Sequence, residues 1–252
     1  MTDIMAGQIV VRDIGVVIFD KDGTLIDLHT YWSAMVKMRA ENICERLGLV
    51  DDQIYGLMDS MGVDVKNGRI KPEGPVGIKK REIVLGYAAQ YLSNNGINIS
   101  NSDIEAIFAT ADLESLNRLD EIIKSLPGMH KLIDDLHRAD VKVAIATTDR
   151  TERASLALRH LGINDRVACV VGADMVRKPK PDPEMIEIIC EMLDVSVSRS
   201  VMVGDTTIDL EMGNNANVAA SIGVESGLTC RVELEGLSPI VVKDISYLKV
   251  VR

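Results

Sequence analysis

Short apolar runs, each followed by polar or charged residues, constrain the fold of this chain more than any other feature. Continuous apolar runs with little polar alternation are typical of strands buried on both faces of a parallel sheet. The runs are Val16–Phe19, Val141–Ala146, Val167–Val171, Val201–Val203 and Val218–Ile222. Lys142 and Ser221 are the only polar residues within them.

Helical patterns separate these runs in the second half of the chain. Met129, Leu132, Ile133 and Leu136 recur at helical spacing, and a second helix has Asp182 as its expected N-cap and Pro183 as its first residue. Strands that alternate with helices predict an α/β fold with a doubly wound parallel sheet.

One long interval interrupts this alternation. No buried strand is expected between Asp20 and Val141, and the intervening patterns are helical. We expect residues 1–26 and 126–252 to form the core domain and residues 27–125 to form a helical insert. The expected helices of the insert are Tyr31–Leu47, one through Ile83, Tyr87 and Tyr91, and one from Ile104 to Ile123, with Lys66–Arg81 as a turn-rich connector.

Composition excludes several classes of protein. A net charge of −10 over 252 residues disfavours nucleic acid as a partner. No apolar run is long enough to span a membrane, and the first residues lack a signal-peptide pattern, so we expect a cytoplasmic protein. The four cysteines match no zinc pattern and are expected to be free core residues. A monomer and a dimer are both compatible with the sequence.

The residues that follow the apolar runs are the candidates for catalysis and ligand binding. The carboxyl ends of parallel strands meet at one edge of a sheet, where ligands bind. Four such ends bring carboxylates, hydroxyl groups and a lysine toward that edge. These residues are Asp20, Asp22, Thr147, Thr148, Lys178, Asp205 and Asp209.

Clustered carboxylates repel one another, and a hard divalent cation relieves the repulsion. Mg²⁺ binds a few carboxylate oxygens and completes its coordination with substrate phosphate, which suits Asp20 and Asp205. Lys178 and Thr147 can donate to the remaining phosphate oxygens. Asp20 can attack the phosphorus, and Asp22 is placed to give the leaving group a proton.

Four segments resemble the motifs of the haloacid dehalogenase-like (HAD) superfamily, in the order of that family. They are IFDKDGTLID, VAIATT, RKPKPDP and VMVGDTTIDLEMGNNA. The resemblance implies a Rossmann-like core with a helical cap, as in the branches that resemble phosphoglycolate phosphatase and β-phosphoglucomutase, and the cap is expected to select the substrate.

Carried over by position, the resemblance makes Asp20 the nucleophile and a metal ligand, and Asp22 the general acid/base, whose backbone carbonyl also binds the metal. Thr147, Thr148 through its backbone, and Lys178 would bind phosphate. Asp205 would complete the Mg²⁺ site, and Asp209 would orient a metal-bound water or Lys178. The neighbouring Lys180 is expected to face solvent, and Asp149 to cap the next helix together with Glu152.

Three functions remain open at this point. The first is a magnesium-dependent phosphatase that acts on small phosphorylated metabolites such as phosphoglycolate or sugar phosphates. The second is a phosphomutase of the β-phosphoglucomutase type, and the third is a non-enzymatic phosphate-binding module. The presence of Asp20, Asp22 and Asp205 argues against the third.

Overall fold

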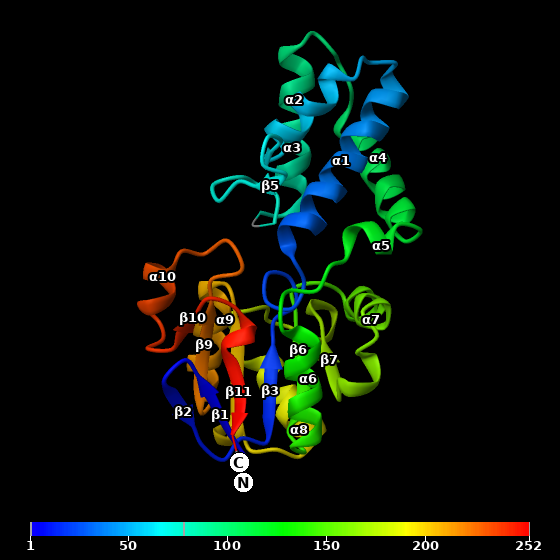
Figure 1. The fold of residues 1–252 in the computed structure, drawn as a ribbon. Helices are drawn as coiled ribbons and strands as arrows, with labels where there is room; N and C mark the ends of the chain where they lie inside the picture. The colour runs from blue at the N-terminus through cyan, green and yellow to red at the C-terminus, as the bar shows by residue number, and fades with distance from the viewer. Residues whose placement is uncertain (1, 78, 252) are drawn as a thin grey trace. The chain divides into compact units, whose positions relative to one another are not determined.

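The computed structural model describes residues 2–77 and 79–251, and these divide into two compact units (Figure 1). One unit contains the residues up to Asp27 together with those from Ser125 onward, and the other is Leu28–Lys124. Ile78, within the connector expected at Lys66–Arg81, lies outside the described residues. In the described part of the chain, no helix is long and apolar enough to cross a membrane.

A six-stranded parallel sheet forms the centre of the first unit, which confirms the predicted fold class. Its strand order is β10-β9-β8-β3-β6-β7. All five apolar runs supply strands, and β10 is an addition at the edge that the sequence pattern did not predict. The strands are β3 (Val16–Phe19), β6 (Lys142–Ala146), β7 (Cys169–Val171), β8 (Ser200–Gly204), β9 (Ala220–Val224) and β10 (Val241–Val242).

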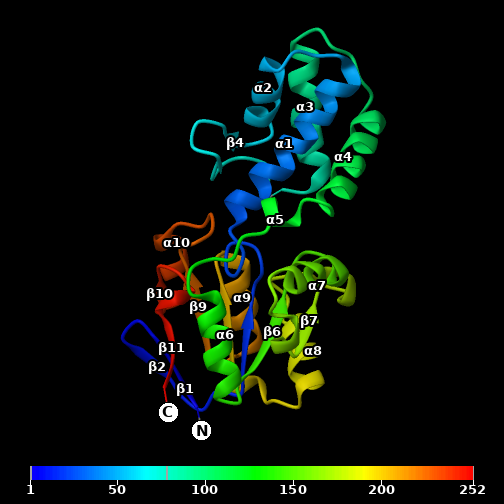
Figure 2. The same cartoon turned by 45° about the vertical axis from the view of Figure 1, so that its right-hand side comes forward.

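Helices cover both faces of this sheet. Val16 and Ile18 of β3 pack in one apolar cluster with Ile186 and Ile189 of α8. Figures 1 and 2 show α6 on the opposite side of the sheet from α8. The α-helices of this unit are α6 (Met129–Arg138), α7 (Thr151–His160), α8 (Glu184–Leu193), α9 (Thr207–Ala216) and α10 (Arg231–Glu235). Short 3-10 helices are η1 (Asn164–Arg166), η2 (Ala173–Met175), η3 (Val197–Arg199) and η4 (Ile245–Tyr247).

A small antiparallel sheet joins the two ends of the chain, and the sequence pattern did not predict it. Its order is β11-β1-β2, with β1 pairing both neighbours. β2 is largely exposed, so it lacks the continuous burial that made the other strands recognisable. The strands are β1 (Asp3–Ala6), β2 (Ile9–Val11) and β11 (Leu248–Val251).

The second unit is helical, with one short hairpin. The helix expected from Ile104 to Ile123 is in fact two, because α4 ends at Ser115. The hydroxyl of Ser115 donates to the backbone oxygen of Asp112 (2.6 Å), a local bond that competes with helix continuation. The elements are α1 (Leu28–Leu47), α2 (Asp52–Ser60), β4 (Val63–Asp64), β5 (Arg69–Ile70), α3 (Arg81–Asn94), α4 (Asn101–Ser115) and α5 (Leu119–Ile122).

The register of the central strands brings the loops that follow β3, β6 and β8 to one edge of the sheet. Phe19 pairs with Ile145 of β6 on one side and with Val203 of β8 on the other. The residues just beyond these three strands therefore leave the sheet at the same edge.

Candidate active site

Asp20 lies at the centre of this edge. It directly follows β3, and its backbone N–H donates to the carbonyl of Val203 on β8 (2.9 Å). The side chain is buried, and Lys180 Nζ donates to its Oδ1 at 2.7 Å. A carboxylate and an ammonium group therefore meet at the point where three strands of the sheet end.

The lysine of this site is Lys180, which corrects two predictions. Lys180 was expected to face solvent, but its side chain is 1% exposed and bonds to both Asp20 and Asp209. Lys178 was expected in the site, but its side chain is 73% exposed and pairs with Asp182 (3.3 Å).

The fold of this loop explains why Lys180, and not Lys178, is buried in the site. Glu184, at the start of α8, accepts hydrogen bonds from the backbone N–H groups of Arg177 and Lys178 (3.0 and 2.9 Å). Closer to the helix, Asn215 of α9 donates to the carbonyl of Pro181 (2.9 Å). The chain contains two overlapping Lys-Pro-x-Pro segments, 178–181 and 180–183. The segment that adjoins α8 supplies the buried lysine, and no local pattern in the sequence distinguishes it from the other segment.

Asp209 holds Lys180 in place. Its Oδ1 accepts from Lys180 Nζ at 2.6 Å, and its Oδ2 accepts from the backbone N–H and the hydroxyl of Thr206 (3.1 and 2.5 Å). Asp209 thus caps α9 and orients the lysine with the same carboxylate. The sequence predicted an orienting role for Asp209, toward Lys178 or a metal-bound water.

Asp205 follows β8 and is enclosed by backbone. A Cβ atom at Gly23 would lie 2.5 Å from Asp205 Oδ2, and one at Gly227 would lie 1.7 Å from the same oxygen. Gly23 also has φ +91°, so this position needs glycine for two reasons. The hydroxyl of Thr24 donates to Asp205 Oδ1 (3.1 Å).

The acidic residues together form a group that could hold a metal ion. One carboxylate oxygen from each of Asp20, Asp205 and Asp209 lies within 4.8 Å of the others, and all three residues are buried. The pKa of Asp20 is raised to about 7, chiefly by burial and also by the charges of Asp209 and Asp22, against the opposing effect of Lys180. Burial and the charges of Asp20 and Asp209 also raise the pKa of Asp205. A single lysine does not balance this many carboxylates, which is the condition that a divalent cation relieves.

Burial lowers the pKa of Lys180, but the charges of Asp20 and Asp209 outweigh burial and raise it above its ordinary value. Lys180 therefore stays protonated and provides a fixed positive charge beside Asp20.

Asp22 lies two residues beyond Asp20, and its carboxylate is partly exposed. Lys21 Nζ lies 2.6 Å from each of its two oxygens. Asp22 is therefore ion-paired to its neighbour in sequence and still partly open to solvent.

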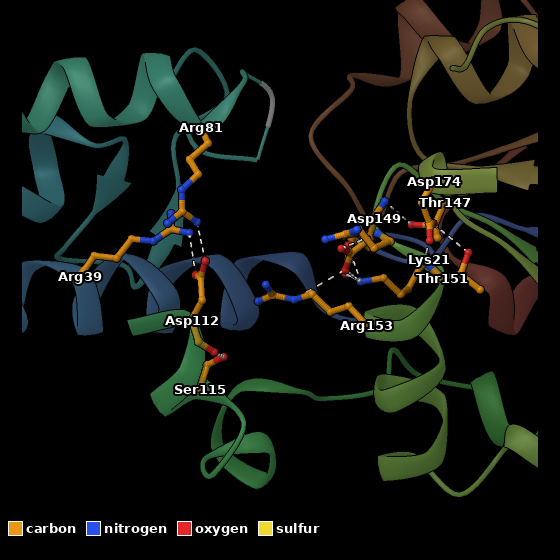
Figure 3. Close-up of polar contacts among 12 residues, drawn as sticks. Lys21, Arg39, Arg81, Asp112, Ser115, Thr147, Asp149, Thr151, Arg153 and Asp174 are labelled. Atoms are coloured by element: carbon orange, nitrogen blue, oxygen red, sulfur yellow. Dashed lines mark hydrogen bonds and ion pairs between the residues drawn. The ribbon is translucent and has the colours of Figure 1, made fainter. Parts of the chain in front are cut away.

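The loop after β6 contains the predicted phosphate-binding residues. Thr147 is buried, and its hydroxyl accepts from the backbone N–H of Asp149 (3.1 Å), whereas Thr148 is exposed. Asp149 does not cap the following helix as predicted. In its place Asp174 accepts from the backbone N–H of Thr151 at the start of α7 (2.7 Å), and Figure 3 shows this group together with Lys21.

Basic side chains of the helical unit, among them His29, Arg69 and Lys71, contact other residues of the same unit. His29 is buried, and its Nε2 lies 2.5 Å from a guanidinium nitrogen of Arg69. Lys71 pairs with Asp59 (2.7 Å).

The four cysteines are free as predicted, although Cys230 is exposed and is no core residue.

Comparison with known proteins identifies the family. The family model of haloacid dehalogenase-like hydrolases matches residues 14–217. Pyrophosphatase PpaX of Listeria monocytogenes is 28% identical over 142 residues, which cover 56% of this chain. The match covers 65% of that relative, so this chain spans somewhat less than two thirds of its length.

Solved structures share the fold. A predicted phosphoglycolate phosphatase from Haemophilus somnus superposes with a TM-score of 0.68 at 14% identity, covering 93% of this chain and 96% of the other. β-Phosphoglucomutase from Clostridium difficile gives a TM-score of 0.58 at 20% identity, with 92% of each chain covered.

Proposed function

The chain belongs to the haloacid dehalogenase-like hydrolase family, and on that premise we propose that it is a magnesium-dependent phosphatase of small phosphorylated metabolites. In this proposal Asp20 carries the phosphoryl group as an aspartyl phosphate. The observation that carries the proposal is the pairing of buried Asp20 with buried Lys180, next to Asp205, at the carboxyl edge of the parallel sheet.

Each step of the proposed reaction uses a group of this chain. An oxygen of Asp20 attacks the phosphorus, the bond to the leaving oxygen breaks, and Asp22 gives that oxygen a proton. Water then attacks the phosphorus of the aspartyl phosphate while Asp22 takes a proton from it. Inorganic phosphate leaves, and Asp20 returns to its starting state.

Lys180 and Thr147 support the transfer. The Lys180 ammonium group, held between Asp20 and Asp209, is placed to neutralise charge on the phosphoryl oxygens. The buried Thr147 hydroxyl and the backbone of Thr148 are proposed to donate to the same oxygens.

The carboxylates fit a magnesium ion. Asp209 already uses both oxygens on Lys180 and Thr206, so we assign the metal to Asp20, Asp205 and the backbone carbonyl of Asp22. When bound, the ion would neutralise charge on the carboxylates and on the phosphate. The raised pKa of Asp20 supports this assignment, because an ionised nucleophile at neutral pH requires more positive charge than Lys180 alone supplies.

Release of phosphate from a panel of phosphorylated metabolites tests the proposal. The panel should contain phosphoglycolate, sugar phosphates and, because a relative is named a pyrophosphatase, inorganic pyrophosphate. We expect turnover with Mg²⁺, none in the presence of a chelator, and none with Asp20→Asn, which keeps the shape of the side chain and removes the nucleophile. Substantial turnover by Asp20→Asn would refute the aspartyl-phosphate route.

The same panel separates a phosphatase from a mutase. A mutase would return the phosphoryl group to a sugar, so a sugar phosphate would be isomerised with little release of phosphate. The selection of substrate by residues 27–125 stays a prediction, and activity profiles of variants in that unit would test it.

A further inference from the structure

The loop that follows β3 contains a buried lysine to which the proposed reaction gives no role. Lys21 stands between Asp20 and Asp22, and its side chain is 2% exposed. Placing an ammonium group in the interior is costly unless it is paired, so its partners indicate why it is there.

The first partner of Lys21 is Asp22. Both oxygens of the Asp22 carboxylate lie 2.6 Å from Lys21 Nζ, so the ammonium group faces the middle of the carboxylate. The Asp22 side chain is 22% exposed, and Lys21 holds it from the buried side. This contact restricts rotation of a carboxylate that would otherwise be free to turn in solvent.

The second partner lies in the loop that follows β6. Lys21 Nζ is 3.5 Å from Asp149 Oδ2, and the backbone N–H of Asp149 donates to the Thr147 hydroxyl. Figure 3 shows Lys21 reaching Asp149, with Arg153 of α7 on the other side of that carboxylate (3.8 Å). Lys21 thus connects the loop of Asp20 and Asp22 to the loop that contains Thr147.

We propose that Lys21 is a positioning residue, which holds the Asp22 carboxyl group in the orientation needed for proton transfer and is itself anchored by Asp149. The inference rests on the proposed function, because it assigns a purpose to Lys21 only if Asp22 moves protons. Proton transfer depends on orientation, and a displacement of about 1 Å can cost a hundredfold in rate. A freely rotating Asp22 would therefore be a poor proton donor even with every other group in place.

Substrates that differ in their need for a proton test this role. An alkyl phosphate releases a basic alkoxide and depends on general acid catalysis, whereas p-nitrophenyl phosphate releases a stable anion and depends on it less. Lys21→Met should lower kcat/KM for the alkyl phosphate by about tenfold or more, and for the aryl phosphate by much less. Because both substrates are measured on one preparation, the ratio of the two losses is independent of the fraction of folded enzyme.

A double-mutant cycle provides the second readout. If Lys21 acts through Asp22, the variant with both Lys21→Met and Asp22→Asn should be no slower with the alkyl phosphate than Asp22→Asn alone. Lys131→Met, which removes an exposed lysine of α6, is the control and should leave both substrates unaffected. Equal losses on the two substrates, no loss, or additive effects in the cycle would overturn the role of Lys21. Absence of turnover by the unaltered enzyme would instead overturn the proposed function, and this inference with it.

Discussion

The carboxylates and the lysine of the site depend on one another for charge. Asp20 and Asp209 both contact Lys180, at 2.7 and 2.6 Å, and all three side chains are almost fully buried. Loss of the lysine leaves two buried carboxylates without their cation. This lowers the free energy of unfolding far more than the loss of an exposed ion pair does. The exposed Lys178–Asp182 pair, two residues away, is the natural comparison.

Replacement of each lysine by methionine distinguishes the two positions. Lys180→Met should lower kcat by roughly a hundredfold to a thousandfold, since it removes a fixed charge beside the phosphoryl oxygens. Lys178→Met removes only an exposed ion pair and should keep kcat within about twofold. Steady-state kinetics checks this once circular dichroism has shown that both variants fold. Inactivity of Lys178→Met with full activity of Lys180→Met would restore the assignment made from the sequence alone.

The sequence was informative about site residues that directly follow strands, and less so about those in longer loops. Asp20 and Asp205 come immediately after buried strands, so their place at the sheet edge follows from the strand pattern. Lys180 lies nine residues after β7, in a loop fixed by Glu184 and Asn215, and no local pattern distinguishes its direction from that of Lys178. The Lys21 contact also escaped prediction, because it depends on Asp149 of another loop.

At the scale of elements, burial on both faces decided which predictions succeeded. β3 and β8 are buried along their whole length, and the apolar runs within them, Val16–Phe19 and Val201–Val203, were recognised. The helix through Ile83 and Tyr87 exists as α3, but these two residues are exposed and Val84, Ala88 and Leu92 face the core. A short surface helix with apolar residues on both sides carries no clear periodicity, so its buried face could not be predicted.

Three helices of the second unit meet at Asp112 of α4, where two arginines converge (Figure 3). Arg39 of α1 contacts it at 3.2 Å, and Arg81 of α3 contacts its other oxygen. Arg39 is 5% exposed and lies over the ring of Phe108, with 4.6 Å between the guanidinium carbon and the ring centroid. Burial lowers the pKa of Arg39, and the charge of Asp112 opposes this effect.

Asp112→Ala should therefore destabilise the helical unit by about 3 kcal/mol, because it leaves a buried guanidinium group without its carboxylate. The chain has one tryptophan, Trp32 of α1, so tryptophan fluorescence during urea unfolding reports on this unit. Glu41→Ala, which breaks the exposed pair with Lys37 on the same helix, is the control and should cost no more than about 0.5 kcal/mol. Equal shifts of the two urea midpoints would contradict a structural role for the Asp112 cluster.

The proposed metal site would link catalysis to the stability of the protein. Asp20 and Asp205 have raised pKa values in the folded protein, and for Asp20 the value is about 7 instead of 3.8. Between about pH 4 and pH 7, Asp20 of the metal-free folded protein therefore keeps a proton that it has released in the unfolded chain. Folding free energy contributed by Asp20 is lost as the pH rises through this range, since the folded state binds more protons.

A cation that binds the deprotonated carboxylates restores the folding free energy that is lost at higher pH. Stabilisation by Mg²⁺ should therefore depend on pH. At pH 8, Mg²⁺ at a hundred times its dissociation constant should stabilise the folded protein by about 2.7 kcal/mol. The same total concentration should give a clearly smaller gain at pH 5, where protons compete for the carboxylates. Thermal unfolding with Mg²⁺ and with a chelator, at the two pH values, measures both gains. Asp205→Asn removes a proposed metal ligand, so it should respond little to Mg²⁺ at pH 8. An equal response to Mg²⁺ at pH 5 and pH 8, or a full response in Asp205→Asn, would exclude this carboxylate group as the metal site.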